Sequence, residues 1–280
     1  MSARMTNGQR VAGFWGQVIL ILLLAFALGP IILFAGSALK SRAELQSNPF
    51  GLPQQWLFGN FADAWEQAGM GMGLLNSAIL VGGTVLIVLV VAGLAAYALA
   101  RLEVPGASAV VAYLLVIGAL PFQMFLVPLF YLETQTGLYD TYLGIIIIYS
   151  AVFAPFATLL LRSFLIGIPR ELEEAARLDG AGELRIAWRI ILPNALPGLL
   201  TVALVTALSA YNEFFLALTF LQSPDRMPVS TTFFAFQTGY SQDLSLTAAA
   251  GVIMLLPMLL LFLALQRRFV DGLASTGMSS

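Results

Sequence analysis

The sequence has no cysteine and no histidine, and only 10% of its 280 residues are charged. The missing cysteines exclude disulfides and thiolate metal sites, although they do not reveal the redox compartment. Without either residue type, Ser-His and Cys-His nucleophilic pairs and histidine-held zinc are excluded as well. The net charge of −2 and the lack of a basic stripe outside the loops give no indication of a nucleic-acid partner.

Apolar residues dominate the chain, at 59% of the sequence. A bilayer core about 30 Å thick needs roughly 20 apolar residues per helical crossing. Six stretches of that length are expected to cross, near residues 14–38, 74–100, 107–132, 142–166, 194–221 and 246–268. Their continuous Leu, Val, Ile and Ala runs lack the alternation of barrel strands. The predicted fold class is therefore all-α, a polytopic membrane protein with about six transmembrane helices.

The basic residues predict the orientation of this bundle, because cytoplasmic loops are enriched in Lys and Arg. With the N-terminus inside, ten of the thirteen fall on the cytoplasmic side, and only Lys40, Arg42 and Arg226 fall outside. Both termini are thus expected in the cytoplasm. A cleaved signal peptide is the alternative for the first segment, but its apolar run is longer than the roughly 7–15 residues typical of one.

The expected organisation is one transmembrane domain, 14–268, between a cytoplasmic N-terminus, 1–13, and a cytoplasmic tail, 269–280. It includes external loops 39–73 and 222–243 and a cytoplasmic loop 167–193. The first external loop reads as a structured connector whose tryptophans, Trp56 and Trp65, suit the membrane interface.

The cytoplasmic loop is rich in charge and predicts two short helices. Pro169 suits the first turn of a helix, and Gly180 suits its end. The second helix is expected to end at Pro193. On the first, Leu172, Ala175 and Ala176 should share an apolar face, and on the second Leu184, Trp188 and Ile191 should form a stripe. These patterns fit a rigid knob or a solvated connector equally well.

The spacing Glu174-Ala175-Ala176, three residues, Gly180, nine residues, Ile190-x-Leu192-Pro193 resembles the EAA motif of binding-protein-dependent ABC importer permeases. The resemblance implies the type I permease fold of these importers. It also implies that the helix pair is a coupling helix seated in a cytoplasmic ATPase. The residues carried over are Glu174 and Gly180, supported by Ala175, Ala176 and Asp179.

The chain lacks a P-loop, since its only lysine, Lys40, follows Leu39 rather than glycine. We therefore expect no cofactor in this chain, with ATP and Mg²⁺ bound by a partner ATPase. The expected partners are a second homologous permease, two copies of that ATPase, an external solute-binding protein and membrane lipid. A homodimeric permease is the alternative to a sister subunit. The expected location is the cytoplasmic membrane of a bacterium or archaeon.

Two runs, Leu120–Phe130 and Ser209–Phe220, and the tail Arg267–Leu273 resemble the carbohydrate branch of these permeases, most nearly the shorter maltose-type subunit. The likeness extends from about residue 70 to the end and implies uptake of a sugar or polyol. Gln123, Tyr211, Asn212 and Glu213 supply groups that hold sugars and are candidates for the substrate pathway. An acid within a membrane span is expensive, so Glu213 should face a cavity or a partner; a packing hydrogen bond is the alternative.

The second external loop is rich in aromatics, and the resemblance implies that Phe233, Phe234, Phe236 and Tyr240 reach the docked binding protein. A re-entrant or membrane-surface segment is the alternative. Other function classes fit less well. A secondary transporter should show more intramembrane acids or an inverted repeat, and a membrane enzyme should show clustered catalytic groups. Amino-acid or phosphate-ester cargo is the nearest competitor to sugar.

Overall fold

A computed structural model describes the backbone of residues 7–239 and 243–277, and the side chains of residues 16–238, 243–264 and 266. Within these ranges every regular element is helical and no strand occurs, so the all-α prediction is confirmed. Five helical spans are long and apolar enough to cross a membrane: Gly16–Ser37, Met70–Arg101, Tyr142–Ile166, Glu183–Asn212 and Leu244–Ala264. A bent pair of helices raises the number to six if it is one span.

The chain divides into two compact units. The first, residues 1–70 and 235–254, contains α1 (Asn7–Ser37), α2 (Arg42–Ser47), α3 (Gly59–Gln67) and the start of α13 (Leu244–Gly277). Its loop 39–73 is ordered around Lys40, which is 1% exposed and donates to the carbonyls of Asn48 (2.7 Å) and Pro49 (3.2 Å). A buried ammonium group needs such acceptors, so the sole lysine is an internal anchor of this loop.

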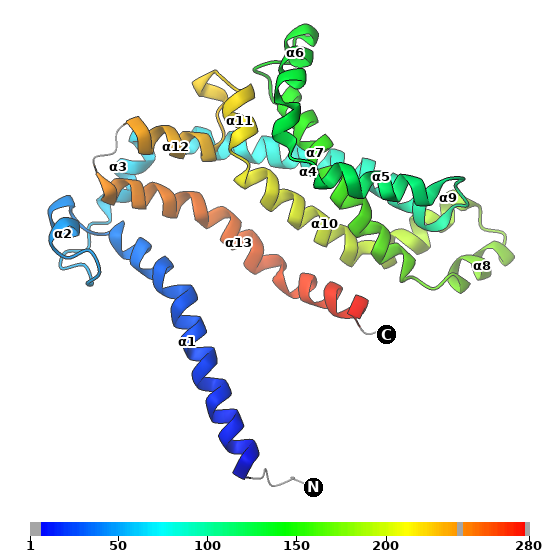
Figure 1. Cartoon of the computed structure of the whole chain (residues 1–280), viewed down its shortest axis with the longest axis horizontal. Coiled ribbons are helices and arrows are strands. Elements are labelled where there is room, and N and C mark those ends of the chain that lie inside the picture. The colour runs from blue at the N-terminus through cyan, green and yellow to red at the C-terminus, as the bar shows by residue number, and fades with distance from the viewer. Residues whose placement is uncertain (1–6, 240–242, 278–280) are drawn as a thin grey trace. The chain divides into compact units, whose positions relative to one another are not determined.

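The second unit, residues 71–234 and 255–280, holds the remaining elements and is built around α4, α7 and α10 (Figure 1). Its elements are α4 (Met70–Arg101), α5 (Ala107–Ala119), η1 (Phe122–Phe125), α6 (Leu126–Thr136), α7 (Tyr142–Ile166), α8 (Glu171–Leu178), α9 (Glu183–Ile186), η2 (Ala187–Ile191), α10 (Leu192–Asn212), α11 (Phe215–Phe220), η3 (Pro224–Arg226) and α12 (Val229–Gly239). α12 and α13 each contribute to both units.

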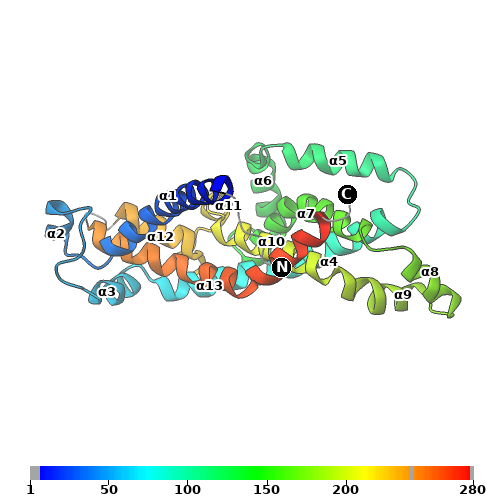
Figure 2. The same ribbon diagram turned by 90° about the horizontal axis from the view of Figure 1, so that it is seen from below.

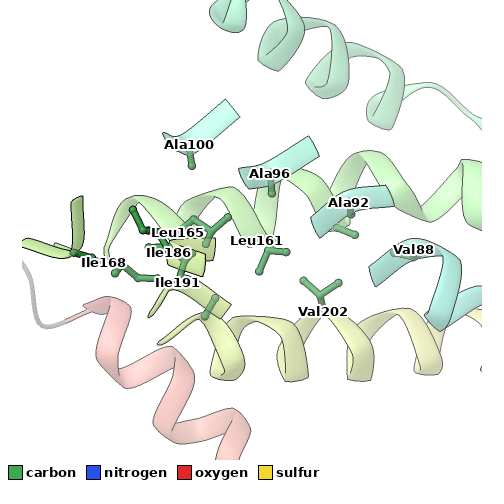
Figure 3. Packing of buried hydrophobic residues seen from close by; sticks show 13 residues of the cluster. Val88, Ala92, Ala96, Ala100, Leu161, Leu165, Ile168, Ile186, Ile191 and Val202 are labelled. Atoms are coloured by element: carbon green, nitrogen blue, oxygen red, sulfur yellow. The ribbon is translucent and has the colours of Figure 1, made fainter. Parts of the chain in front are cut away.

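Small residues at every fourth position let α4 approach its neighbours closely. Ala92, Ala96 and Ala100 lie opposite Leu161 and Leu165 of α7 in the buried cluster of Figure 3. Alanine stripes of this kind are typical of helix packing in lipid, where close backbone approach supplies the contact energy. The same cluster includes Ala176, Ile186 and Ile191 from the loop 167–193, so that loop packs onto the helical core.

The predicted crossing 107–132 is not one continuous helix. α5 ends at Ala119, and the axis turns by 90° before the segment Phe122–Thr136 (Figure 2). Leu120 is extended (ψ 137) because a residue before proline is driven out of the helical region, and Pro121 has no N–H to continue the ladder. The expected proline kink is therefore a full break.

The predicted crossing 194–221 is also wrong at both ends. Its helix begins at Glu183, runs through Pro193, and stops at Asn212, after which α11 forms separately. Pro193 does not end the second loop helix as expected. It lacks the N–H for an α-helical bond to Arg189, and the π-helical turn η2 lies at this point.

Candidate functional site

The loop 167–193 lies at one end of the second unit, where α8 and α9 follow α7 (Figure 1). α8 carries Glu171, Glu173 and Glu174 in its first turn and Arg177 in its last, matching the helix dipole. The helix begins two residues after Pro169, so Pro169 precedes the first turn instead of forming it.

Gly180 ends α8, as predicted from the sequence. Its φ of +78° is left-handed, which suits glycine because it has no Cβ. The N–H of Gly180 donates to Arg177 (3.0 Å) and that of Ala181 to Ala176 (2.9 Å), the paired bonds of a Schellman motif. This closure turns the chain directly toward α9.

The buried face of α8 differs from the predicted one. Leu172 is 42% exposed and Ala175 is exposed, whereas Glu173 (4%) and Ala176 (9%) point inward. The reason is Arg101 at the end of α4, whose Nη1 lies 3.0 Å from Oε1 of Glu173. The buried Arg101 needs a carboxylate partner, so α8 turns Glu173 inward and leaves the apolar Leu172 exposed.

The five motif residues therefore fall into two groups, one buried and one exposed. Ala176 belongs to the core, and the others lie on the outer surface of the loop: Glu174, Ala175, Asp179 and Gly180. The stripe predicted on the second helix also divides, because Ile191 is buried while Leu184 and Trp188 are 74% and 65% exposed. A shallow surface pocket includes Gly180, Leu184 and Trp188 in its lining.

Leu178, Leu184 and Trp188 form what we call the exposed apolar patch. Leu178 is 89% exposed, and it ends α8 beside the outward motif residues. Large apolar side chains exposed together on a charged loop favour an interaction surface over a solvated connector. Sequence reasoning missed Leu178, although its position two residues before Gly180 is a signal that it is displayed at the helix end.

Three of the four pathway candidates, Tyr211, Asn212 and Glu213, lie where α10 ends, just before α11 begins. Tyr211 is buried (6% exposed), whereas Asn212 is exposed and donates to the carbonyl of Leu208 (2.9 Å). Gln123 is exposed on η1, which lies beside α11 through a contact between the rings of Phe122 and Phe215. Three candidates are therefore consecutive in the chain, and Gln123 lies on a segment that contacts α11. Their contact with solute stays a prediction.

Glu213 lies in the break itself, and both oxygens of its carboxylate accept hydrogen bonds from within the chain. Oε2 accepts the hydroxyl of Tyr149 (2.9 Å), and the two oxygens accept the N–H groups of Leu216 (3.0 Å) and Ala217 (3.1 Å). It therefore caps α11 and ties this helix to α7. The packing alternative raised by the sequence is what this geometry supports.

The candidates for contact with a binding protein lie on α12, except Tyr240, which is outside the described residues. Phe233 is half-buried, and Phe234 is 40% exposed with its ring 4.7 Å from that of Phe214. Phe236 is only 3% exposed, so its ring packs inside the chain. Of the three that the structure describes, Phe234 has the most exposed side chain.

A hydrogen-bond network that the sequence reasoning missed fixes the chain between α11 and α12. Asn76 of α4 donates to the carbonyls of Asp225 and Met227 (both 2.9 Å) and accepts the hydroxyl of Tyr142 (2.8 Å). Asp140 accepts the N–H groups of Gln222 (2.9 Å) and Ser223 (3.1 Å). An asparagine inside a long apolar run was the available signal.

Asp140 predicts a pH dependence of stability. Burial alone raises the pKa of its carboxyl, but hydrogen bonds from Ser223 and Gln222 and the charge of Arg226 outweigh it, leaving the pKa below its ordinary value of 3.8. The stabilisation that ionised Asp140 gives the folded protein is complete above its ordinary pKa. It is lost as the pH falls through the lowered pKa of the folded state. Between pH 5 and pH 3 the unfolding temperature of the purified protein should fall less for Asp140→Asn than for the wild type. Asp225→Asn is the control, because Asp225 lies in η3, close in sequence to the residues that Asp140 binds. An equal fall in all three proteins would contradict this prediction.

The fold described here is that of ABC importer permeases. The permease chain in the crystal structure of a bacterial ABC transporter that imports alginate superimposes with a TM-score of 0.79 over 96% of this chain and 100% of that one, at 24% identity. At that identity the likeness concerns the fold alone.

The family is shown by sequence. The family described as "binding-protein-dependent transport system inner membrane component" matches residues 89–275, and this chain belongs to it. The chain is 35% identical to the diacetylchitobiose uptake system permease protein of Streptomyces coelicolor, over 93% of this chain and 87% of that one. It is 34% identical to the melibiose/raffinose/stachyose import permease protein of Bacillus subtilis, over 88% and 89%.

Proposed function

We propose that this chain is a transmembrane permease subunit of an ATP-driven, binding-protein-dependent importer for a sugar, oligosaccharide or sugar-like solute. The observation that carries the coupling part of this proposal is the loop 167–193, which joins a buried base to an outward surface. Ala176, Ile186 and Ile191 belong to the helical core, while Leu178 and Trp188 face outward. Such a knob can receive force from a cytoplasmic partner and pass it to α7 and α10.

The proposed partner at this surface is a P-loop ATPase that binds ATP and Mg²⁺, in two copies. A second permease subunit, homologous to this one, and an external solute-binding protein complete the importer. This chain moves the solute by alternating access and breaks no bond in it. Counting the bent pair α5–α6 as one crossing gives six, which supports both termini on one side of the membrane, and the excess of Lys and Arg in the loops on that side supports the cytoplasm.

Sugar cargo is supported by the two relatives, since both are named for the uptake of oligosaccharides. A screen of the cognate binding protein against sugars, polyols, amino acids and phosphate esters tests the cargo class. Tight binding of an amino acid or phosphate ester, with no sugar bound, would replace this part of the proposal.

The docking surface has a direct test in the assembled importer. Leu178→Asp and Glu174→Lys should each release the ATPase from the purified complex. Leu178→Asp replaces an apolar contact by a charge, and Glu174→Lys reverses the charge of an outward side chain. A buried leucine contributes about 1.5–3 kcal/mol, so Leu178→Asp should weaken association by about tenfold or more. Co-purification of the ATPase and uptake of labelled solute are the measurements.

The control is Leu52→Asp, because Leu52 is also highly exposed (79%) but lies in the segment 39–73. The control should retain the ATPase. Full association and uptake in both loop variants would refute the docking assignment.

A further inference from the structure

Arg101 and Glu173 form the most deeply buried ion pair in the described part of the chain. Arg101 ends α4, Glu173 lies in α8, and their side chains are 2% and 5% exposed. Nη1 of Arg101 and Oε1 of Glu173 are 3.0 Å apart, close enough for a strong charge interaction. Neither residue belongs to the motif residues discussed above.

The same guanidinium also holds the end of α7. Nη2 of Arg101 donates to the carbonyl of Ile168 (2.7 Å) and to that of Leu165. Carbonyls at the C-terminal end of a helix have no partner within it and favour a nearby cation. One side chain therefore joins the end of α4, the end of α7 and the inner face of α8.

The ion pair continues outward through the loop. Oε2 of Glu173 lies 3.5 Å from Nη2 of Arg177, whose Nε lies 2.7 Å from Oε1 of Glu183. Glu183 begins the helical span that runs on to Asn212. Arg177 and Glu183 are 44% and 60% exposed, so solvent screens this outer part and the buried pair dominates.

A buried ion pair is a poor source of net stability, since apolar residues of similar volume often stabilise as well or better. What it supplies is a defined geometry, because sliding α8 away from α4 would leave two charges unpaired in a dry site. Ala176 is buried three residues after Glu173 on the same inner face of α8, and its small side chain lets α8 pack closely against the helical core.

We propose that the Arg101–Glu173 pair is the rigid joint that makes α8 and the ends of α4 and α7 move as one body when the ATPase moves the loop. The two residues are positioning residues: they contact neither nucleotide nor solute. This inference rests on the proposed function and extends it from the surface that receives the motion to the contact that transmits it.

The main test uses the whole importer, reconstituted in nanodiscs or proteoliposomes with its ATPase and binding protein. Glu173→Gln and the double variant Arg101→Met/Glu173→Leu should keep the ATPase bound, while solute moved per ATP hydrolysed falls about tenfold. The double variant is informative because it fills the site without charge. If the pair served stability alone, the double variant would be stable and fully coupled, and that result would overturn the proposal.

Arg162→Met is the matched control. Nε of Arg162 donates to the carbonyl of Leu99 (3.2 Å), so it also joins α7 to α4 but does not reach α8. Its ratio of solute to ATP should stay within about twofold of the wild type. A tenfold loss in this variant too would show that any arginine between these helices matters equally, and would overturn the assignment to α8.

A distance measurement tests rigidity independently of transport. The chain has no native cysteine, so spin labels can be attached specifically to the substitutions Leu102→Cys and Leu172→Cys. Both leucines are accessible, at 48% and 42% exposed. We expect one narrow distance in all nucleotide states of the wild type and a broadened distribution in the double variant. A distance that changes through the cycle in the wild type would overturn the rigid joint. Absence of any ATPase from the complex would instead refute the proposed function.

Discussion

Alanine at Gly144 should destabilise the protein severely, although it adds only one methyl group. Gly144 lies in the first turn of α7, where a Cβ would come closer than 3.0 Å to the carbonyl oxygen of Leu138 and to the carboxylate of Glu133. The Glu133 side chain can rotate, but the Leu138 carbonyl belongs to the backbone. That backbone is held by the bond from Leu138 N–H to Glu133 (2.9 Å). That bond holds the turn to α6, and the hydroxyl of Thr141, the residue before α7, donates to the Leu138 carbonyl (2.6 Å). The carbonyl therefore cannot move away from Gly144 without breaking one of these bonds.

The expected loss for Gly144→Ala is about 3 kcal/mol, at the upper end of overpacking costs. It should appear as a fall of about 6 °C or more in the unfolding temperature of the detergent-solubilised protein. Gly93→Ala in α4 is the control, because nothing lies within 4 Å of its Cβ position. Alanine is the better helix former there, so the control should unfold at the same temperature or higher. Equal behaviour of the two variants would show that α7 does not approach the Leu138 turn this closely.

Four of the six membrane spans could be predicted closely from the sequence, because lipid imposes a simple rule on length and apolarity. The same rule cannot detect a break inside an apolar run. The stretch 107–132 is predominantly apolar and carries no charged residue, and Pro121 signals only that the hydrogen-bond ladder is interrupted. Whether the result is a kink or a turn of 90° depends on where neighbouring helices leave space, and α5 packs against α7. That information is tertiary.

The candidate site shows the same division between local and tertiary information. Gly180 as the end of α8 is a local property, and the structure confirms it. The choice between Glu173 and Glu174 as the inward acid is not local, since the two are adjacent and chemically alike. Arg101, far upstream in the sequence, makes that choice by pairing with Glu173. Apolar periodicity predicts that Leu172 is buried, because a pattern of apolar positions contains no information about a buried cation on another helix.

The second large effect is expected at Glu213, where alanine and glutamine should differ sharply. Glu213→Ala would leave the hydroxyl of Tyr149, a residue that is 0% exposed, and the N–H groups of Leu216 and Ala217 without their acceptor. Each buried unsatisfied group costs about 1–3 kcal/mol, so the summed loss should be about 3 kcal/mol or more. Glutamine keeps an acceptor oxygen of the same reach and should lose about 1 kcal/mol. Thermal unfolding of both variants in detergent gives the comparison.

Uptake by the Glu213→Gln variant separates the packing role from a role in the substrate pathway. Both carboxylate oxygens are already used within the chain, so removing the charge should leave the KM for solute within about twofold of the wild type. Tyr149→Phe removes only one of the donors and should reproduce the mild loss of stability with the same KM. A tenfold rise in KM for Glu213→Gln, with no such rise for Tyr149→Phe, would instead assign the carboxylate to solute. The α10–α11 break would then be a binding element, whose hydrogen bonds exchange between Leu216, Ala217 and the cargo.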